Sequence, residues 1–413
     1  MDRKKIRFQL SLTEFIYNGC FAAANFLSIF LASIGFSAGQ IGLISALISG
    51  VGIASQPTWG VISDRLRSVK RCFVLCMLGT ALCAAVIPAA SGGATILLPA
   101  LLMLMYFFFH PSNMMMELWL VRVSSHPQLQ ISYGSIRSWA SIGYALFNLA
   151  LVPVLRLMPT RVVYYFLAAF ASLALAAALR VPAQSEAQGE AQPRQRLRDM
   201  PFRDILNYWI VGHILFEVLY QIPHGWRVTY MVFVLKDYGV DGSLYGALMF
   251  VAGICEVPML LLSKRLTRRV GWAWPMIMSA AILTLEYGLY AWGSSLPVLF
   301  AAQLLRGFSF ALYVSCRFQY VYRLAPRGLE GSTQALVDAV SAVANFAAAA
   351  AGGFLLERMG THGFYVFLCG FQAVSGLFFI AVHAFGRRVL HIPLPDAQCA
   401  LGRVRAGEQQ TDK

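Results

Sequence analysis

The sequence predicts an all-α integral membrane protein in which twelve transmembrane helices form two pseudo-symmetric bundles of six. The 413 residues are 58% hydrophobic and only 13% charged, with a mean hydropathy of +0.63. A soluble domain carries about 25% charged residues, so this composition excludes an ordinary soluble fold. Hydropathy separates about twelve apolar segments of about 20 residues, which is the length that crosses ~30 Å of hydrocarbon.

The net charge of +14 reflects membrane topology and not nucleic-acid binding. Most of the 33 Lys and Arg residues lie on alternate loops and on the two tails. Cytoplasmic loops of membrane proteins carry such an excess. We therefore expect a multi-pass protein of the cytoplasmic (inner) membrane, with both termini in the cytoplasm and with the lipid bilayer, not nucleic acid, as its surroundings. The opposite loops and their flanks carry only Arg156, Arg161, Lys236 and Arg358.

Residues 1–181 are predicted to form the N-terminal bundle. After a basic start, helices are expected at residues 8–34, 40–62, 72–90, 94–123, 133–157 and 162–179. The second of these ends in Asp64-Arg65 and opens a basic loop. Residues 182–203 are rich in Gln, Glu, Ala, Pro and Arg, and we expect them to form a cytoplasmic linker.

Residues 204–385 are predicted to form the C-terminal bundle, and residues 386–413 a cytoplasmic tail. Helices are expected at residues 205–235, 244–263, 272–292, 297–322, 333–356 and 364–385, the first of them interrupted at Pro223-His224-Gly225. Residues 263–266 (Ser-Lys-Arg-Leu) repeat residues 63–66 (Ser-Asp-Arg-Leu), and on this alignment Glu256 stands where the first half has Gln56. Parallel six-helix repeats of this kind place a substrate site near the bilayer midplane, between the halves.

The stretch Tyr-Gly-Ser-Ile-Arg-Ser-Trp-Ala-Ser-Ile-Gly-Tyr at residues 133–144 opens a membrane helix that contains an arginine. An arginine at bilayer depth costs at least ~2.5–3.5 kcal/mol unless it faces a partner or water. Arg137, Ser141 and Tyr144 share one helix face. A cation, a hydroxyl and an aromatic ring on one face suit a polar organic solute. The alternative is a packing face with one structural salt bridge.

Six acidic residues lie within or at the ends of predicted helices: Glu14, Glu117, Glu217, Glu256, Glu286 and Asp338. Glu117 and Arg137 flank a short loop, so they are plausible partners. Glu286 and Arg306 flank another turn, and there a static salt bridge is the favoured interpretation. Carboxyls desolvated in a membrane can bind and release protons near neutral pH, as in transporter proton relays. We expect functional roles for Glu117 and Glu256.

The remaining ionisable groups give weaker signals. Glu14 lies close to the basic start and could be interfacial. Glu256 and Asp338 have no partner fixed by the sequence, though Arg317 is available. His213 and Glu217 are spaced i, i+4, but one such pair without further ligands does not make a metal site. A nucleotide-binding Gly-rich loop and a Gly-x-Ser-x-Gly motif are both absent. We expect neither an enzyme nor a cofactor, with the proton as coupling ion.

The residues 133–144 and the Asp64-Arg65 loop resemble the lactose permease group of the major facilitator superfamily, the oligosaccharide/proton symporters, and the related phenylpropionate-permease-like transporters. This resemblance implies the major facilitator fold, and it makes Asp64 and Arg65 a conformational latch. It also makes Glu117 and Arg137 the pair that grips sugar hydroxyls, and Tyr144 the ring that stacks on the sugar.

In the predicted helix at residues 244–263 the resemblance makes Glu256 the acid that joins sugar binding to proton coupling. In the predicted helix at residues 205–235 it places Glu217 and Gln221 in a polar, charge-pairing stretch. The chain also departs from the group's pattern. Where the group has a histidine and a glutamate on its tenth helix, this chain has Arg306 and Ser309. Where the group has an arginine on its ninth helix, this chain has Glu286. Met259 stands in place of the asparagine that follows the acid on the group's eighth helix.

The predicted function is proton-coupled uptake of a small polar solute, most simply a sugar, glycoside or oligosaccharide, by a monomer with alternating access. The expected substrate-binding residues are Glu117, Arg137, Tyr144, Ser141, Tyr17, Asn18, Glu217 and Gln221, and the expected coupling residues are Glu256, Glu286, Arg306 and Asp338. The alternatives are a symporter of an aromatic acid or nucleoside, a proton-coupled exporter of drugs or metabolites, a receptor or scaffold without flux, and a membrane-embedded enzyme. Costly charges in the membrane argue against the receptor.

Overall fold

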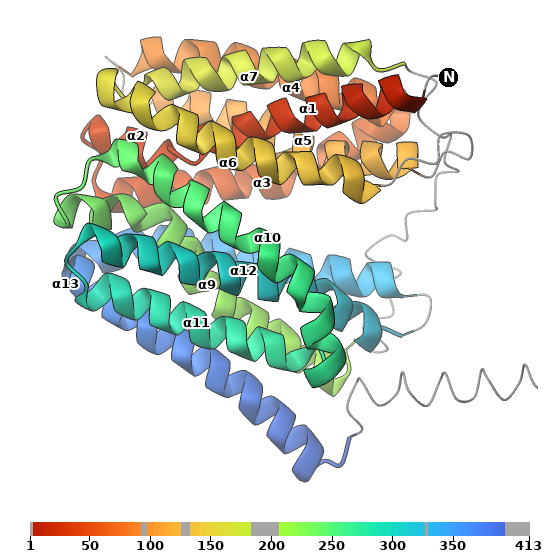
Figure 1. Ribbon diagram of the computed structural model, residues 1–413, viewed down its shortest axis with the longest axis vertical. Coiled ribbons are helices and arrows are strands. Elements are labelled where there is room, and N and C mark those ends of the chain that lie inside the picture. The colour runs from red at the N-terminus through yellow and green to blue at the C-terminus, as the bar shows by residue number, and fades with distance from the viewer. Residues whose placement is uncertain (1–2, 92–96, 125–132, 183–205, 327–328, 393–413) are drawn as a thin grey trace, which may run out of the picture. The chain divides into compact units, whose positions relative to one another are not determined.

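A computed structural model describes residues 3–91, 97–124, 133–182, 206–326 and 329–392 of the chain (Figure 1). These residues are helical almost throughout, and no strand occurs among them. The predicted linker at residues 182–203 and most of the predicted tail at residues 386–413 lie outside the described residues.

Every segment predicted to span the membrane coincides with helix where the structure describes it. The first half contains α1 (Arg3–Ala24), α2 (Leu27–Ser33), α3 (Ala38–Leu66), α4 (Val69–Ala90), α5 (Leu97–Ser124), α6 (Tyr133–Leu157) and α7 (Val162–Arg180). The second half contains α9 (Tyr208–Asp237), the 3₁₀ turn η3 (Gly242–Leu244), α10 (Tyr245–Val270), α11 (Ala273–Trp292), α12 (Leu296–Leu324) and α13 (Glu330–Arg388). α13 covers the last two predicted segments, and Gly360 interrupts its helical backbone at φ 67° and ψ 171°.

Two predicted helices differ from the structure. The first was expected to be continuous, but it breaks between α1 and α2 at Asn25 and Phe26. The Asn25 N–H donates to the Phe21 carbonyl at 3.1 Å, as in an α-helix. The next N–H, of Phe26, donates to the Ala23 carbonyl, also at 3.1 Å, which closes a tighter turn.

The interruption predicted at Pro223-His224-Gly225 is wrong, because α9 runs through it without a break. A neighbouring helix supports this stretch. The Trp226 indole N–H donates to the Ala348 carbonyl of α13. A Cβ on Gly225 would lie 2.9 Å from Asn345 Oδ1, so the glycine allows close packing here and does not break the helix.

By compactness the chain divides into two units. Unit 1 contains Met1–Arg194, Thr229–Gly253 and Ala349–Glu357, and unit 2 contains Gln195–Val228, Ile254–Ala348 and Arg358–Lys413. Within unit 1, α1 packs against α6 and α7, α4 against α5 and α7, and α3 against α5. Within unit 2, α11 packs against α12. The linear bundle boundaries at residues 181 and 204 remain predictions.

Glycines allow three very close backbone contacts in unit 1. A Cβ on Gly143 of α6 would lie 2.3 Å from the Phe15 carbonyl oxygen of α1. On Gly246 of α10 it would lie 2.1 Å from the Asn148 carbonyl oxygen, and on Gly353 of α13 it would lie 2.3 Å from the Ala38 carbonyl oxygen. Small residues at such positions bring membrane helices together without a hydrophobic driving force.

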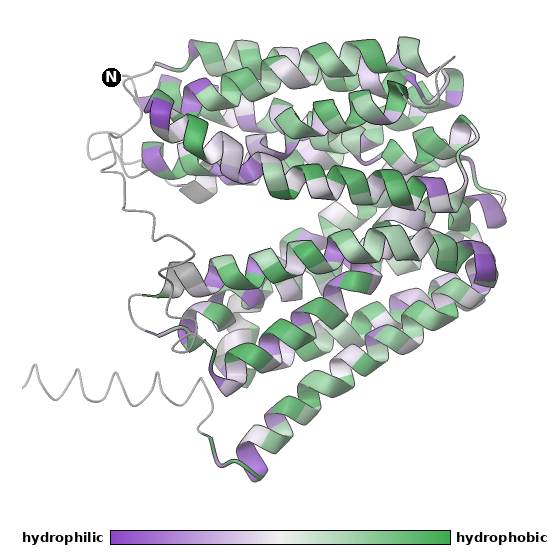
Figure 2. Ribbon diagram, turned by 180° about the vertical axis from the view of Figure 1, so that it is seen from behind, coloured by the Kyte–Doolittle hydropathy of each residue, from purple (hydrophilic) through white to green (hydrophobic). Residues whose placement is uncertain are grey.

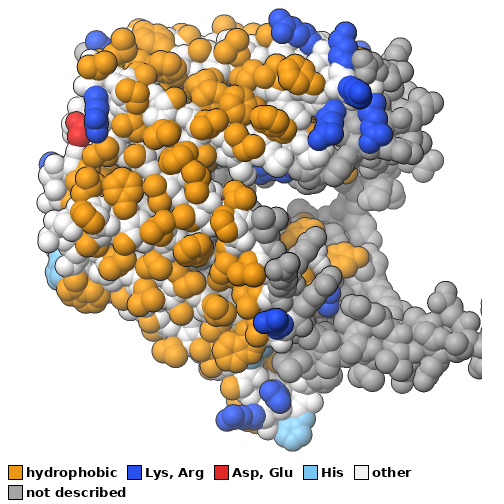
Figure 3. Space-filling model, viewed as in Figure 1, with side chains coloured by type: hydrophobic (Ala, Val, Ile, Leu, Met, Phe, Trp, Pro, Cys, Tyr) orange, Lys and Arg blue, Asp and Glu red, His pale blue; other side chains and the backbone are white. Residues whose placement is uncertain are grey.

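The outer surface of the described helices is suited to hydrocarbon. Nine helical stretches among the described residues are long and apolar enough to cross a membrane, judged by length and composition. Hydrophobic residues run along most of each helix, whereas hydrophilic ones gather near many helix ends (Figure 2). Apolar side chains cover the visible face of the helices, and Lys and Arg gather at the end of unit 1 that carries the N-terminus (Figure 3).

Replacing Gly143 with alanine should separate α1 from α6. The new Cβ would meet backbone atoms of Phe15 that cannot rotate away, and overpacking of this kind costs about 1–3 kcal/mol. We expect a lower midpoint of thermal unfolding for the purified protein in detergent. Gly370→Ala is the matched control, because nothing lies within 4 Å of its Cβ position and alanine favours helix by about 1 kcal/mol. Equal midpoints for the two variants would contradict the close contact.

Candidate functional site

In unit 1, an arginine and two glutamates from three helices form a charged group. Arg137 of α6 donates from Nε to Glu117 Oε1 of α5 at 2.8 Å, and its Nη1 lies 3.8 Å from Glu14 Oε1 of α1. The side chains of Arg137 and Glu117 are 40% and 31% exposed, whereas that of Glu14 is 3% exposed. The predicted Glu117–Arg137 pairing is confirmed, and the partly exposed pair can offer a cation and an anion to a solute. Glu14 is buried among its protein neighbours, and its interpretation as an interfacial residue stays a prediction.

The local structure accounts for this meeting. Arg137 lies in the first turns of α6, and Glu117 lies within two turns of the end of α5, so the short connection between the helices brings them to the same depth. Glu14 precedes Phe15, whose carbonyl is the close neighbour of Gly143 on α6. The close α1–α6 contact therefore brings Glu14 within reach of Arg137.

Tyr144 lies on the same face of α6 as Arg137, and both contact α1 or the residues just after it. The Tyr144 hydroxyl accepts a hydrogen bond from Asn25 Nδ2 at 2.6 Å, and Asn25 lies at the break between α1 and α2. One turn further along α6, Asn148 Nδ2 donates to the Tyr144 carbonyl at 2.8 Å. Asn25 was not predicted as a site residue, and its only sequence signal is an amide within an otherwise apolar stretch. Broken membrane helices commonly border binding sites.

The other predicted binding residues of the first half differ in their surroundings. Tyr17 is 1% exposed, shares a 2.8 Å hydrogen bond with Ser112 and packs against Phe21 and Phe73. It is therefore a core residue of unit 1, which does not support its predicted role in substrate binding. Asn18 Nδ2 donates to the Glu14 carbonyl at 2.9 Å, which is a bond within α1. Ser141 is exposed on α6.

In unit 2, the carboxylate of Glu217 accepts several hydrogen bonds at one oxygen. Its Oε1 accepts from Arg317 Nε at 2.7 Å, from Gln221 Nε2 at 3.1 Å, from Ser341 Oγ at 3.2 Å and from the Tyr313 hydroxyl. Glu217 is 1% exposed. The predicted neighbours Glu217 and Gln221 therefore contact each other, and the carboxylate is held by charge-assisted bonds.

Asp338 joins this group through the same arginine. Arg317 Nη2 donates to Asp338 Oδ1 at 2.6 Å, so the suggested pairing of Asp338 with Arg317 is confirmed. His213, fully buried on α9, lies 3.9 Å from Glu217 Oε2. No group of three His, Cys, Asp or Glu side chains that could hold a metal is found among the described residues.

A static salt bridge was predicted between Glu286 and Arg306, but the partner of Glu286 is a different arginine. Glu286 of α11 pairs with Arg227 of α9 at 3.5 Å, and both side chains are almost completely buried. Arg306 Nη1 donates instead to Gln303 Oε1 at 3.2 Å, three residues earlier on α12, and Gln303 Nε2 donates to the Tyr290 hydroxyl at 2.7 Å. Nothing in the sequence joins Arg227, which lies inside the helix predicted at residues 205–235, to Glu286.

Glu256, Asp64 and Arg65 are the remaining predicted residues. Glu256 is half-buried on α10, two positions before Pro258. Arg65 is exposed near the end of α3, and the side chain of Asp64 lies outside the described part of the structure. Their roles in coupling and as a latch remain predictions.

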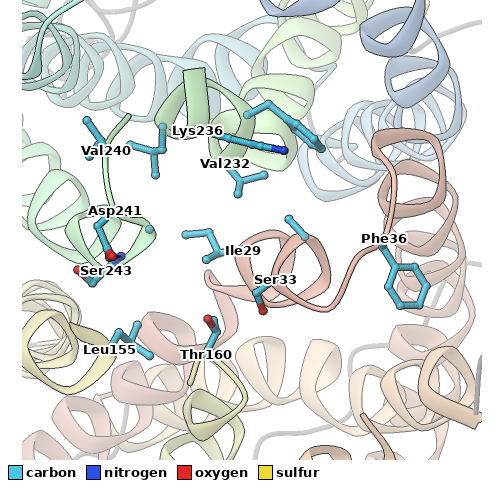
Figure 4. A pocket seen from close by; sticks show the side chains of 14 residues that line it. Ile29, Ser33, Phe36, Leu155, Thr160, Val232, Lys236, Val240, Asp241 and Ser243 are labelled. Carbon is cyan, nitrogen blue, oxygen red and sulfur yellow. Dashed lines mark hydrogen bonds between the residues drawn. The ribbon is translucent and has the colours of Figure 1, made fainter. Parts of the chain in front are cut away.

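A cavity of about 390 Å³ opens in unit 1 beside none of the predicted site residues. It lies among α2, the last turn of α6, the end of α9 and the segment leading to η3, and its polar lining residues include Ser33, Thr160, Lys236, Asp241 and Ser243 (Figure 4). Hydrogen bonds from the side chain and the backbone N–H of Ser243 hold the pKa of Asp241 below its ordinary value. The cavity thus presents a carboxylate as well as apolar walls at neutral pH.

Comparison with known proteins assigns the chain to a family. The family model described as MFS_1 like family matches residues 8–367. The uncharacterized transporter YwbF of Bacillus subtilis (strain 168) is 25% identical over 343 residues, which are 82% of this chain and 83% of that protein. The maltose permease of Geobacillus stearothermophilus is 27% identical over 363 residues, which are 84% and 86% of the two chains.

Solved structures share the fold at low sequence identity. The nucleoside transporter NupG superposes with a TM-score of 0.78 at 15% identity, covering 93% of this chain and 99% of that chain. A D-xylose-proton symporter superposes with a TM-score of 0.66 at 15% identity, covering 91% and 96%. Together with the family match, these likenesses show that the chain belongs to the MFS_1 like family and is a secondary transporter with the major facilitator fold.

Proposed function

We propose that this protein imports a sugar, glycoside or oligosaccharide together with protons. The observation that carries the proposal is the partly exposed Glu117–Arg137 pair, joined at 2.8 Å, whose arginine lies on the same face of α6 as the Tyr144 ring. A guanidinium and a carboxylate hold hydroxyls through charge-assisted bonds, and an aromatic ring packs on the apolar face of a sugar. The maltose permease relative and the fold shared with the D-xylose-proton symporter support this substrate class.

The rest of the proposal concerns coupling and setting. We place the protein in the cytoplasmic membrane as a monomer, with both termini in the cytoplasm and with the proton as its coupling ion. Glu256, Glu286, Arg306 and Asp338 are the coupling residues proposed in the second half. Glu286 and Asp338 each pair with an arginine, so a change in their protonation would change an ion pair inside unit 2.

A nucleoside is the second candidate substrate. The superposition on NupG, with a TM-score of 0.78, is what favours it. A nucleoside carries ribose hydroxyls and a base, so the same pair and the same ring would suit it. An exporter remains a third possibility, which the direction of flux distinguishes.

Uptake into proteoliposomes tests the function. We expect labelled maltose to accumulate under an inward proton gradient and to leak out when the gradient is collapsed. Each charge-assisted bond is worth about 1.5–3 kcal/mol, so Arg137→Ala should lower transport efficiency about 10- to 100-fold. Arg180→Ala, at the exposed end of α7, is the matched control.

D-xylose, uridine and phenylpropionate complete the panel of labelled probes. Accumulation of uridine or phenylpropionate in place of a sugar would show that the substrate is a nucleoside or an aromatic acid, and it would agree with proton-coupled uptake. If both Arg137→Ala and Glu256→Gln accumulate maltose as the wild type does, the roles proposed for Arg137 in substrate binding and for Glu256 in coupling are wrong. No accumulation of any probe, with proton release when a drug-like cation is added, would favour an exporter.

Removing one partner of the buried Arg227–Glu286 pair should destabilise the protein. Glu286→Gln leaves the buried Arg227 without its anion, and breaking a buried pair in this way costs about 3–5 kcal/mol. We expect a clearly lower midpoint of thermal unfolding in detergent. The double variant Arg227→Gln/Glu286→Gln removes both charges and should recover much of the loss. A single variant as stable as the wild type would show that the two side chains do not depend on each other.

A further inference from the structure

The cavity of about 390 Å³ in unit 1 is formed by two separate parts of the chain (Figure 4). One wall consists of α2, Phe36, Leu155 and Thr160, and the other consists of the end of α9 and residues 240–243. Every lining residue belongs to unit 1. Ligand sites in proteins have volumes of about 300–1,000 Å³, so this cavity is large enough for a small organic molecule.

The spacing of residues on the two helices explains what each wall presents. Ile29 and Ser33 are spaced i, i+4, so they lie on one face of α2. Val232 and Lys236 have the same spacing and share a face of α9. Each helix therefore brings an apolar and a polar side chain to the cavity.

Two opposite charges and two hydroxyls are the main polar groups of the lining. The Asp241 carboxylate is held at the start of η3, where its Oδ1 accepts from the Ser243 N–H at 2.6 Å. No hydrogen bond or ion pair of the Lys236 ammonium or the Thr160 hydroxyl occurs among the described residues. The Ser33 hydroxyl donates to a carbonyl of its own helix at 2.7 Å, so its oxygen can still accept. The cavity thus offers donors and acceptors to a ligand.

These groups suit a neutral molecule that is rich in hydroxyls. A carboxylic acid would pair with Lys236 but would be repelled by Asp241, which the hydrogen bonds from Ser243 keep ionised at neutral pH. A cation such as Ca²⁺ takes about six to eight oxygen ligands, whereas the lining contains one carboxylate. An apolar molecule would leave both charges without hydrogen bonds. Hydroxyls both donate and accept, so one molecule can bond the ammonium and the carboxylate together.

The cavity lies far along α6 from the Glu117–Arg137 pair. Arg137 is in the second turn of α6, and Leu155 stands 18 positions further on, which is about 27 Å of helix. α2, which lines the cavity, lies at the end of unit 1 away from the N-terminus (Figure 1). A solute held by the pair therefore leaves the cavity free, and the two are separate sites.

We propose that the cavity is a second solute site, which takes a neutral, hydroxyl-rich molecule such as a sugar. Its walls come from both halves of the sequence, so a bound molecule connects α2 to the end of α9. Alternating access moves one half against the other. A molecule in the cavity opposes that movement, and a high concentration of solute therefore slows transport. Only this inhibition rests on the proposed function; binding in the cavity does not.

Cysteine labelling tests binding in the cavity. Ser33→Cys places a thiol in the lining, and N-ethylmaleimide should modify it in nanodiscs, which are free of sugar-headed detergent. Maltose should slow this modification, as measured by mass spectrometry of the labelled peptide. Ser294→Cys, an exposed position between α11 and α12 outside the cavity, is the control, and maltose should not change its rate. Equal rates for Ser33→Cys with and without maltose would overturn the proposal.

Further substitutions in the Ser33→Cys protein locate the bound maltose. Lys236→Met and Asp241→Asn each remove a charge-assisted bond, so each should raise the maltose concentration for half protection about 10-fold or more. Both side chains are exposed, so these variants should fold. Arg137→Ala should leave half protection unchanged. If Arg137→Ala abolishes protection, maltose acts from the other site and the proposal is wrong. Protection by phenylpropionate in place of maltose would overturn the proposed ligand chemistry.

Transport separates this inference from the proposed function. In proteoliposomes, the wild-type rate of maltose uptake should pass through a maximum and fall at high concentration, whereas Lys236→Met should reach a plateau. If the wild type accumulates maltose and both proteins reach the same plateau, the inhibition is wrong while the symporter stands. If the wild type accumulates none of the probes, the proposed function fails, and the labelling result still decides whether the cavity binds maltose.

Discussion

The ion pairing of the Arg137 guanidinium with Glu117 and Glu14 is the interaction on which unit 1 depends. It connects α6 to α5 through Glu117 and brings α1 to the same point through Glu14. A charge inside the hydrocarbon is stable only with such partners, so the position of the arginine constrains three helices at once. The close contact of Gly143 with Phe15 makes this possible, because a larger residue would hold α1 away from the arginine. Packing and electrostatics therefore specify the same arrangement.

The sequence predicted the helices well because hydropathy and length decide which segments enter the membrane. It predicted helix breaks poorly. A proline suggests an interruption, yet α9 continues through Pro223 because α13 supports the helix on that side. Asn25 gives no such warning, and the helix breaks at a residue whose side chain bonds Tyr144 on a distant part of the chain. Local sequence does not contain this information.

Local sequence also predicted only some of the ion pairs. Glu117 and Arg137 are joined by a short loop, so antiparallel neighbours at equal depth could be inferred directly. Glu286 and Arg306 also flank a short turn, but Glu286 pairs with Arg227, which lies on a helix far away in the sequence. Which of several arginines reaches an acid depends on how the helices rotate about their axes. Hydropathy fixes depth but leaves that rotation undetermined.

Each unit holds a trio of two acids and one arginine, which are Glu14, Glu117 and Arg137 in unit 1 and Glu217, Asp338 and Arg317 in unit 2. Moving the arginine from the fifth helix of one half to the fourth helix of the other leaves the charge count unchanged, because each trio keeps two acids and one base. What changes is the supply of neutral donors. Tyr313, Gln221 and Ser341 donate hydrogen bonds to Oε1 of Glu217, while Oε2 of Glu217, like Oε2 of Glu14, has no hydrogen-bond partner among the described residues. The two units thus keep the same charge count and differ in the neutral side chains that hold the buried acid.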